Sequence, residues 1–265
     1  MLYYSPRLCK DICLVTGDPW LKIRLAAFDI DGTLTVDRDT AVLHLGAINS
    51  LRKLDESGIV VVLVSSNALP IVVGLKKYLG LRGPAIGETG ALIYYDPGTI
   101  VSTTKHTAKQ ALLDALNEFK EYVYETWQNM FRYHDYALKI KPEHKRRDRE
   151  IYEMIKEYLE KKYPYIKVGY SGYAIHLTPR DTGKGKALLH IMEKLGISPN
   201  EALGVGDSHM DWEFIKVTKY KAAVSNADPE LLEKVDIKLS KPSGEGVTEL
   251  VEKILKKINI NKPQR

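Results

Sequence analysis

The chain has 265 residues, of which 44% are hydrophobic and 28% are charged, and its formal net charge is +5. This length suits one core domain with one insert, and the composition is typical of a globular protein. No apolar run approaches the roughly 20 residues that a membrane-spanning helix needs, so no membrane segment is expected. The basic residues are spread out without an aromatic RNA-binding pattern, so nucleic acid is not an expected partner.

The first segment carries little structural signal. Its two cysteines, Cys9 and Cys13, have no second pair downstream, which argues against a structural disulfide or a zinc site. This cysteine usage and the lack of a signal-peptide pattern predict a cytoplasmic protein. Residues 1–21 show no helix or strand periodicity and are treated as an unassigned N-terminal extension.

The most informative stretch is an apolar run that ends at two carboxylates. Residues 25–28 predict a strand that is buried on both faces, and Asp29 and Asp31 follow at its carboxyl end. In extended backbone these two side chains point the same way and can share one small volume. A magnesium ion would relieve their repulsion, because Mg²⁺ takes oxygen ligands. The alternative is a plain Asp-Gly turn, with Gly32, after a core strand.

The next elements predict a βαβ series. Apolar spacing predicts a helix over residues 41–54, and the unbroken β-branched run 59–64 predicts a second parallel strand. Ser65 and Ser66 end this strand, where a hydroxyl can donate to a phosphate oxygen. The alternative is that a serine caps the helix predicted to begin at Pro70.

The pattern then changes. Residues 84–103 predict a short strand, a glycine-rich turn and a hairpin around Asp96 to Gly98. We interpret residues 104–177 as an inserted α/β cap with its own sheet, so that residues 22–103 and 178–265 form a Rossmann-like parallel core with helices on both faces. The predicted cap elements are a helix over 108–124, a strand over 131–140, a helix over 147–162, and strands over 166–170 and 173–177.

Polar residues also precede two later elements. Lys184 lies in a glycine-lysine run before a predicted helix, where it can neutralise a phosphate or simply be a solvated lysine. The run is not a P-loop, because Ala187 follows the second Gly-Lys pair where Ser or Thr is needed. Asp207 and Asp211 follow the predicted strand 202–205 and share a helix face. Their alternatives are a helix cap and compensation of the helix dipole, and His209 between them is interpreted as a loop residue.

Taken in order, the Asp-Ile-Asp-Gly-Thr motif at 29–33, Ser65 after a strand, Lys184, and the Gly-Asp-Ser-His-Met-Asp motif at 206–211 resemble the four motifs of the haloacid dehalogenase superfamily of phosphohydrolases. The resemblance covers the chain from Ile23 onward. The insert between Ser65 and Lys184 resembles the larger α/β cap of the Cof-type branch.

This resemblance implies roles for the four aspartates. Asp29 would attack phosphorus and form an aspartyl phosphate, and Asp31 would serve as general acid and then as general base. Mg²⁺ would be held by Asp29, Asp207 and Asp211, together with the backbone carbonyl of Asp31.

It also implies substrate-binding roles. Ser65 and Lys184 would bind the phosphoryl oxygens, and Ser66 and Asn226 are further substrate-binding candidates. Arg132, expected on the first cap strand, is a candidate for binding a substrate carboxylate, because a guanidinium can pair with it in bidentate fashion. The alternative for Arg132 is an ordinary surface arginine.

Within the superfamily, Gly-Glu-Thr-Gly at 87–90 and Ser-Gly-Tyr-Ala-Ile-His at 171–176 resemble the archaeal phosphoglycolate phosphatases, relatives of sucrose-phosphate phosphatases. This implies Mg²⁺-dependent hydrolysis of a small phosphorylated metabolite, 2-phosphoglycolate, by a monomer or homodimer. The alternatives are a phosphatase or phosphomutase for a sugar phosphate, of the sucrose-phosphate or mannosyl-phosphoglycerate type, and a non-enzymatic phosphate-binding protein.

Overall fold

The computed structural model describes residues 22–260, and the predicted extension of residues 1–21, with both cysteines, lies outside this range. The chain divides into two compact units. In the described part, the first unit contains residues 22–62, 78–83 and 192–260, and the second contains residues 63–77 and 84–191. The predicted separation of a core from a cap of residues 104–177 is a different division and stays a prediction.

The larger sheet has eight strands in the order β12-β11-β10-β1-β2-β3-β4-β5. In the first unit, four strands pair in parallel: β1 (Leu25–Asp29), β10 (Ala202–Gly206), β11 (Tyr220–Ala223) and β12 (Ile237–Lys238). All five residues of β1 are buried, as the continuous apolar run predicts for a parallel strand. The predicted α/β class with a mainly parallel sheet is therefore confirmed.

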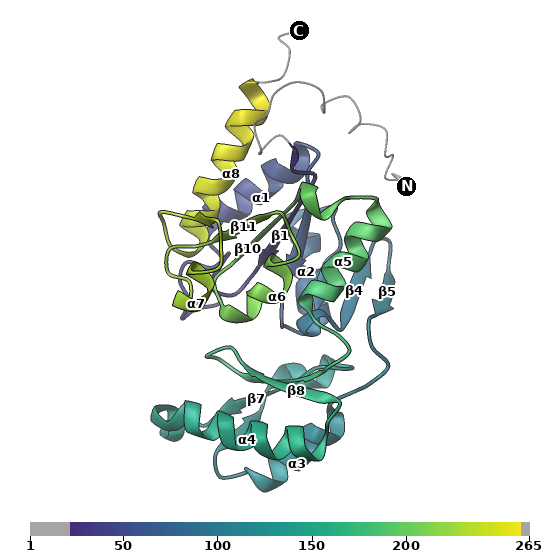
Figure 1. The fold of residues 1–265 in the computed structure, drawn as a ribbon, viewed down its shortest axis with the longest axis vertical. Coiled ribbons are helices and arrows are strands. Elements are labelled where there is room, and N and C mark those ends of the chain that lie inside the picture. Colours follow the sequence, from purple (N-terminus) through teal and green to yellow (C-terminus); the bar gives the residue numbers. More distant parts are fainter. Residues whose placement is uncertain (1–21, 261–265) are drawn as a thin grey trace. The chain divides into compact units, whose positions relative to one another are not determined.

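The helices of the first unit cover this sheet. Helices α1 (Leu45–Glu56) and α8 (Ser243–Ile260) pack against each other (Figure 1), and α6 (Trp212–Ile215) packs against β10 and β11. Short helical turns complete the unit: η6 (Pro199–Glu201), η7 (His209–Asp211) and α7 (Pro229–Leu232). Helix α1 begins later than predicted, because Leu43 pairs with Thr35 in a β-bridge and the His44 side chain accepts the N–H of Ala47.

Strand β2 (Val60–Val64) begins in the first unit and ends in the second, where it pairs in parallel with β3 (Ala85–Gly87). The turn η3 (Glu88–Gly90) leads to β4 (Leu92–Tyr95) and β5 (Thr99–Ser102), which form the predicted hairpin. Helix α2 (Leu69–Leu79) follows β2, and α5 (Lys184–Leu195) follows the insert.

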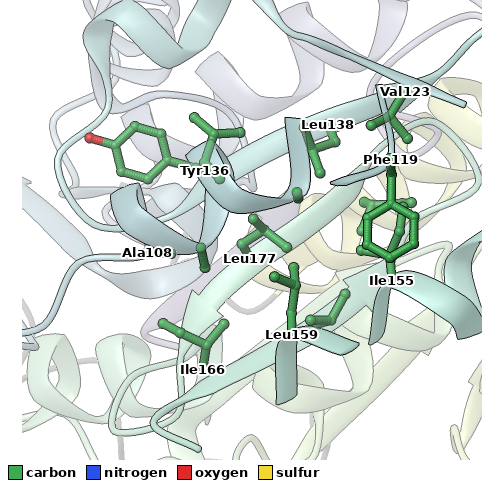
Figure 2. Packing of buried hydrophobic residues seen from close by; sticks show 14 of the residues in the cluster. Ala108, Phe119, Val123, Tyr136, Leu138, Ile155, Leu159, Ile166 and Leu177 are labelled. Atoms are coloured by element: carbon green, nitrogen blue, oxygen red, sulfur yellow. The ribbon is translucent and has the colours of Figure 1, made fainter. Parts of the chain in front are cut away.

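The insert has its own antiparallel sheet in the order β6-β7-β9-β8. Its strands are β6 (Val123–Glu125), β7 (Tyr136–Ile140), β8 (Ile166–Tyr170) and β9 (Ile175–Pro179), and its helices are α3 (Lys109–Glu118), η4 (Trp127–Phe131), η5 (Pro142–Arg147) and α4 (Asp148–Lys162). Helices α3 and α4 lie on one side of β7 and β8 (Figure 1). Ile155 and Leu159 of α4 pack with Phe119, Leu138 and Leu177 in the core of this layer (Figure 2).

Two predicted cap elements need correction. The helix predicted over 108–124 ends at Glu118, and the chain then turns into β6. The strand predicted over 131–140 starts only at Tyr136, so Arg132 lies after η4 and not on a strand. The physical reason is that the N–H groups of residues 133–135 donate to the buried Glu88 carboxylate and not to a neighbouring strand.

Within residues 22–260 no helix combines the length and the apolar character that crossing a bilayer requires.

Candidate active site

The first group of predicted site residues follows two neighbouring parallel strands. The register of β1 with β10 pairs Phe28 with Val205, so Asp29 and Asp207 both come at the carboxyl ends of these strands. Ligands of parallel sheets collect at this edge. Asp29, Asp207 and Asp211 are 6%, 2% and 1% exposed.

These three aspartates form one cluster. One carboxylate oxygen from each of Asp29, Asp207 and Asp211 lies within 4.8 Å of the others, although nearly two hundred residues separate the first from the last. Asp31 is exposed and its carboxylate does not belong to the cluster. Its predicted contribution to the metal site is a backbone carbonyl, and that contribution and its acid–base role stay predictions.

Two glycines make room for the cluster. A Cβ atom on Gly32, whose φ is +88°, would lie 2.3 Å from Oδ2 of Asp207. A Cβ atom on Gly206 would lie 2.6 Å from Oδ2 of Asp211. Both distances are far below van der Waals contact, so each carboxylate occupies the space of a missing side chain.

Donors from the chain orient the two later carboxylates. Thr33 Oγ1 donates to Asp207 Oδ1 at 3.1 Å, and Arg38 Nε lies 2.7 Å from Asp207 Oδ2. The N–H groups of Asp207 and Ser208 donate to Asp211 Oδ2 at 3.1 and 3.0 Å. Ser208 and Asp211 form a capping box at the start of η7, so Asp211 has the predicted helix-terminal role and also belongs to the cluster.

Arg38 and Asp228 also lie at this edge, and no sequence motif indicated either residue. Arg38 Nη1 lies 2.9 Å from Asp228 Oδ1, and the N–H and Nδ1 of His209 lie 2.8 and 3.0 Å from Asp228 Oδ2. Burial alone would raise the pKa of Asp228, but hydrogen bonds from His209 and Arg38 lower it well below its usual range. The hydrogen bond between His209 and Asp228 is the largest cause that raises the pKa of His209.

The cluster fits a hard divalent cation. Three buried carboxylates this close repel one another unless positive charge lies between them. Their oxygens are the ligands that Mg²⁺ prefers, and Gly32 and Gly206 allow them to converge. The donor set therefore fits the predicted Mg²⁺.

Ser65 and Ser66 lie in the second unit, directly after β2. Ser65 is buried, its N–H donates to the Ile86 carbonyl at 3.0 Å, and its Oγ accepts the N–H of Asn67 at 3.0 Å. Ser66 is half-buried and its carbonyl accepts from Arg132 Nη2 at 2.9 Å. Ser65 thus shapes the turn before α2, and its predicted contact with phosphate stays a prediction.

Lys184 is the first residue of α5 in the second unit and is only 3% exposed, so the alternative of a solvated lysine is wrong. A close backbone approach precedes it, since a Cβ atom on Gly90 would lie 2.1 Å from the carbonyl carbon of Gly183. Thr182 Oγ1 donates to the Gly90 carbonyl at 3.0 Å and closes the same contact. The turn of residues 88–90 therefore holds the segment that leads to Lys184.

Asn226 pairs with the start of α8. Its Nδ2 donates to Ser243 Oγ at 3.0 Å, and its Oδ1 accepts the N–H of Ser243 at 3.0 Å. Ser243 is buried and has a φ of 41°, so this pair supports an uncommon backbone conformation. A substrate-binding role for Asn226 stays a prediction.

Arg132 is not the surface arginine of the alternative interpretation. It is 7% exposed, its Nη1 forms an ion pair with Asp135, and its Nη2 donates to the Ser66 carbonyl and to Gln128 Oε1 at 3.3 Å. These contacts favour a role in holding the chain, and a contact with a substrate carboxylate stays a prediction.

Known proteins match most of this chain in sequence. A family model described as haloacid dehalogenase-like hydrolase matches residues 26–149 and 114–251. A phosphoglycolate phosphatase of Staphylothermus marinus is 71% identical over 235 residues, which are 89% of this chain and 99% of the relative. A phosphoglycolate phosphatase of Metallosphaera sedula is 36% identical over 236 residues, 88% of this chain and 99% of the relative.

A solved structure also matches. The crystal structure of a Thermoplasma acidophilum protein superimposes with a TM-score of 0.75 at 28% identity, covering 88% of this chain and 98% of the other. The match therefore extends over both units and the insert.

Proposed function

The chain belongs to the haloacid dehalogenase-like hydrolases, and from this we propose that it is a phosphatase that converts 2-phosphoglycolate to glycolate. The observation that carries the proposed chemistry is the buried cluster of Asp29, Asp207 and Asp211 at the ends of parallel strands. The proposed substrate is supported by the relatives from S. marinus and M. sedula, which are phosphoglycolate phosphatases.

In the proposed reaction, a carboxylate oxygen of Asp29 attacks phosphorus and the bond to the ester oxygen breaks. Asp31 gives its proton to the leaving alkoxide, which departs as the alcohol. Asp31 then takes a proton from water, whose oxygen attacks the aspartyl phosphate and releases phosphate. Dividing a very slow hydrolysis into two steps lowers the barrier of each.

The proposed ligands of Mg²⁺ are the carboxylates of Asp29, Asp207 and Asp211 and the backbone carbonyl of Asp31. When bound, the ion neutralises negative charge on the phosphoryl group and on the cluster. Arg38 and Thr33 hold Asp207 in place, and the N–H groups at the start of η7 do the same for Asp211.

We assign Ser65 and Lys184 to phosphoryl binding because they stand in the order that the family motifs require. We also propose that Ser66 and Asn226 bind the substrate. The insert of residues 104–177 is the proposed cap that selects the substrate and excludes water from the intermediate.

We also propose partners, a location and a number of subunits for the protein from its sequence. The protein acts on a small phosphorylated metabolite, with no nucleic-acid or membrane partner, in the cytoplasm and as a monomer or homodimer. The proposed number of subunits can be measured by light scattering.

The test is phosphate release from a panel of phosphomonoesters, each with and without Mg²⁺. The panel holds 2-phosphoglycolate, sugar phosphates such as sucrose phosphate, and p-nitrophenyl phosphate. We expect Mg²⁺-dependent release that is fastest with 2-phosphoglycolate. Faster release from a sugar phosphate would replace the proposed substrate, and no release from any ester would leave only a phosphate-binding protein.

A further inference from the structure

The loop that follows β2 is held by a side chain from the insert. Gln128 of η4 accepts the N–H of Ala68 on Oε1 at 2.9 Å, and its Nε2 donates to Asn67 Oδ1 at 2.8 Å. These residues lie about sixty positions apart in the sequence but within the same unit. One glutamine side chain therefore satisfies both a main-chain and a side-chain group of the loop 65–68.

Arg132 reinforces this contact one turn later. Its Nη2 donates to the Ser66 carbonyl at 2.9 Å and to Gln128 Oε1 at 3.3 Å, so it also fixes the orientation of the glutamine. Asp135 pairs with Nη1 of the same guanidinium, and both partners are buried. A buried ion pair of this kind leaves the guanidinium little freedom to turn elsewhere.

The turn η3 holds the loop from another direction. The N–H of Glu88 donates to the Asn67 carbonyl at 2.8 Å, and the N–H of Thr89 to the Ser65 carbonyl at 3.3 Å. Glu88 and Thr89 have φ values of 50° and 53°, which side-chain-bearing residues adopt only when their surroundings require it. The Glu88 carboxylate in turn accepts three N–H groups of residues 133–135.

We propose that Gln128 and Arg132 are positioning residues for the loop 65–68, so that the insert sets the geometry of the phosphoryl-binding serine. This inference rests on the proposed function, which assigns Ser65 to phosphoryl binding. The link to Ser65 passes through one residue, Asn67. Ser65 Oγ accepts the N–H of Asn67, whose side chain and carbonyl are held by Gln128 and Glu88.

A positioning role and a substrate-contacting role predict different kinetics. 2-Phosphoglycolate and p-nitrophenyl phosphate share the phosphoryl group, but only the first carries a carboxylate. Damage to a phosphoryl-binding loop lowers kcat/KM for both esters by the same factor. Loss of a contact with the substrate carboxylate lowers kcat/KM for 2-phosphoglycolate alone.

The experiment compares Gln128→Leu with Gln110→Leu. Gln110 is an exposed glutamine of α3 that bonds only to Asp114 in the described hydrogen bonds, so the control makes the same chemical change away from the loop. We expect Gln128→Leu to lower kcat/KM about tenfold for both esters, because it leaves the N–H of Ala68 without its acceptor. Gln128→Glu keeps an acceptor for that N–H and should lose less. Gln110→Leu should behave as the unmodified protein.

Hydrogen exchange at the Ala68 amide provides a measurement that does not depend on activity. It should become faster in Gln128→Leu and stay unchanged in Gln110→Leu. Unchanged exchange, or a loss confined to 2-phosphoglycolate, would overturn the positioning role. If the unmodified protein hydrolysed neither ester, the proposed function would fail, whereas the exchange result would still decide whether Gln128 holds the loop.

Discussion

Each unit contains a buried group of carboxylates, and the two groups are built in different ways. In the first unit Asp29, Asp207 and Asp211 bring their oxygens within 4.8 Å of one another. In the second unit Glu88 and Asp135 are each surrounded by hydrogen-bond donors of the chain. In the first group three carboxylates converge on one place, whereas in the second Glu88 accepts main-chain N–H groups and Asp135 pairs with charged side chains.

In the second unit, Asp135 is surrounded by hydrogen-bond donors. Asp135 pairs with Arg132 and His176 and accepts hydroxyl hydrogen bonds from Thr89 and Thr178. Burial alone would raise the pKa of Asp135, but the hydrogen bond and charge of His176 and the charge of Arg132 lower it. A carboxylate paired like that of Asp135 stabilises the fold, whereas three converging carboxylates can hold a cation.

The largest expected effect tests the first group. Asp29→Asn should lower kcat for 2-phosphoglycolate by at least about a thousandfold, or on the order of 4 kcal/mol, because it removes the proposed nucleophile. The measurement is phosphate release at saturating Mg²⁺. The control is Asp39→Asn, the same change at an exposed residue of the following loop, which should keep normal turnover. Near-normal turnover in Asp29→Asn would refute the nucleophile assignment.

Breaking the Arg132–Asp135 ion pair of the second unit should lower the free energy of unfolding. Arg132→Met leaves Asp135 buried without its guanidinium, so we expect the free energy of unfolding to fall by about 3 kcal/mol. Denaturant unfolding measures this change. The control, Arg147→Met, breaks an exposed ion pair with Glu150 in the same unit and should leave the stability unchanged. Equal losses in the free energy of unfolding would show that the buried ion pair contributes no more to stability than the exposed one.

A third substitution tests whether the aspartate cluster of the first unit needs the space beside Gly32. Gly32→Ala places a methyl group against the Asp207 carboxylate, and we expect Mg²⁺ affinity to fall at least about tenfold, or about 1.4 kcal/mol. Gly58→Ala is the matched control, because Gly58 also has a positive φ, of 101°, but a Cβ atom there meets nothing within 4 Å. Calorimetric titration with Mg²⁺ should therefore separate the two variants. Equal affinities would show that the carboxylate can move aside.

The smallest expected effect concerns the pH dependence of stability. Burial is the main reason that the pKa of Glu88 is raised above 4.5, so its contribution is present below that pH and is lost as pH rises through the folded-state pKa. Glu88→Gln should remove this loss and gain relative stability as pH rises from 4.5. Asp135 has the opposite sign: its lowered pKa contributes stability above 3.8 that is lost as pH falls.

Unfolding measured across this pH range checks both signs. Asp135→Asn should reduce the loss in the free energy of unfolding as pH falls below 3.8. Glu88→Gln should reduce the loss as pH rises above 4.5. If Glu88→Gln changed the pH dependence of unfolding only below 3.8, the assignment of the raised pKa to Glu88 would be wrong.

Much of the fold could be predicted where local pattern and tertiary structure agree. The apolar runs that predicted buried parallel strands are the strands β1 and β2, and every residue of both is buried. Prediction failed at residues 131–135, where the Glu88 carboxylate of η3 accepts the N–H groups of residues 133–135. A propensity pattern contains no information about such a distant acceptor.

The sequence by itself determined which aspartates stand at strand ends, because the end of an apolar run and a spacing of two or four residues can be counted along the chain. Only the tertiary structure decided that Arg38 and Asp228 accompany Asp207, and that Gln128 and Arg132 hold the loop after β2. These contacts join residues of unrelated local pattern across 60 or more positions. Their partners are selected by packing and by the need to satisfy buried charge, which no single segment specifies alone.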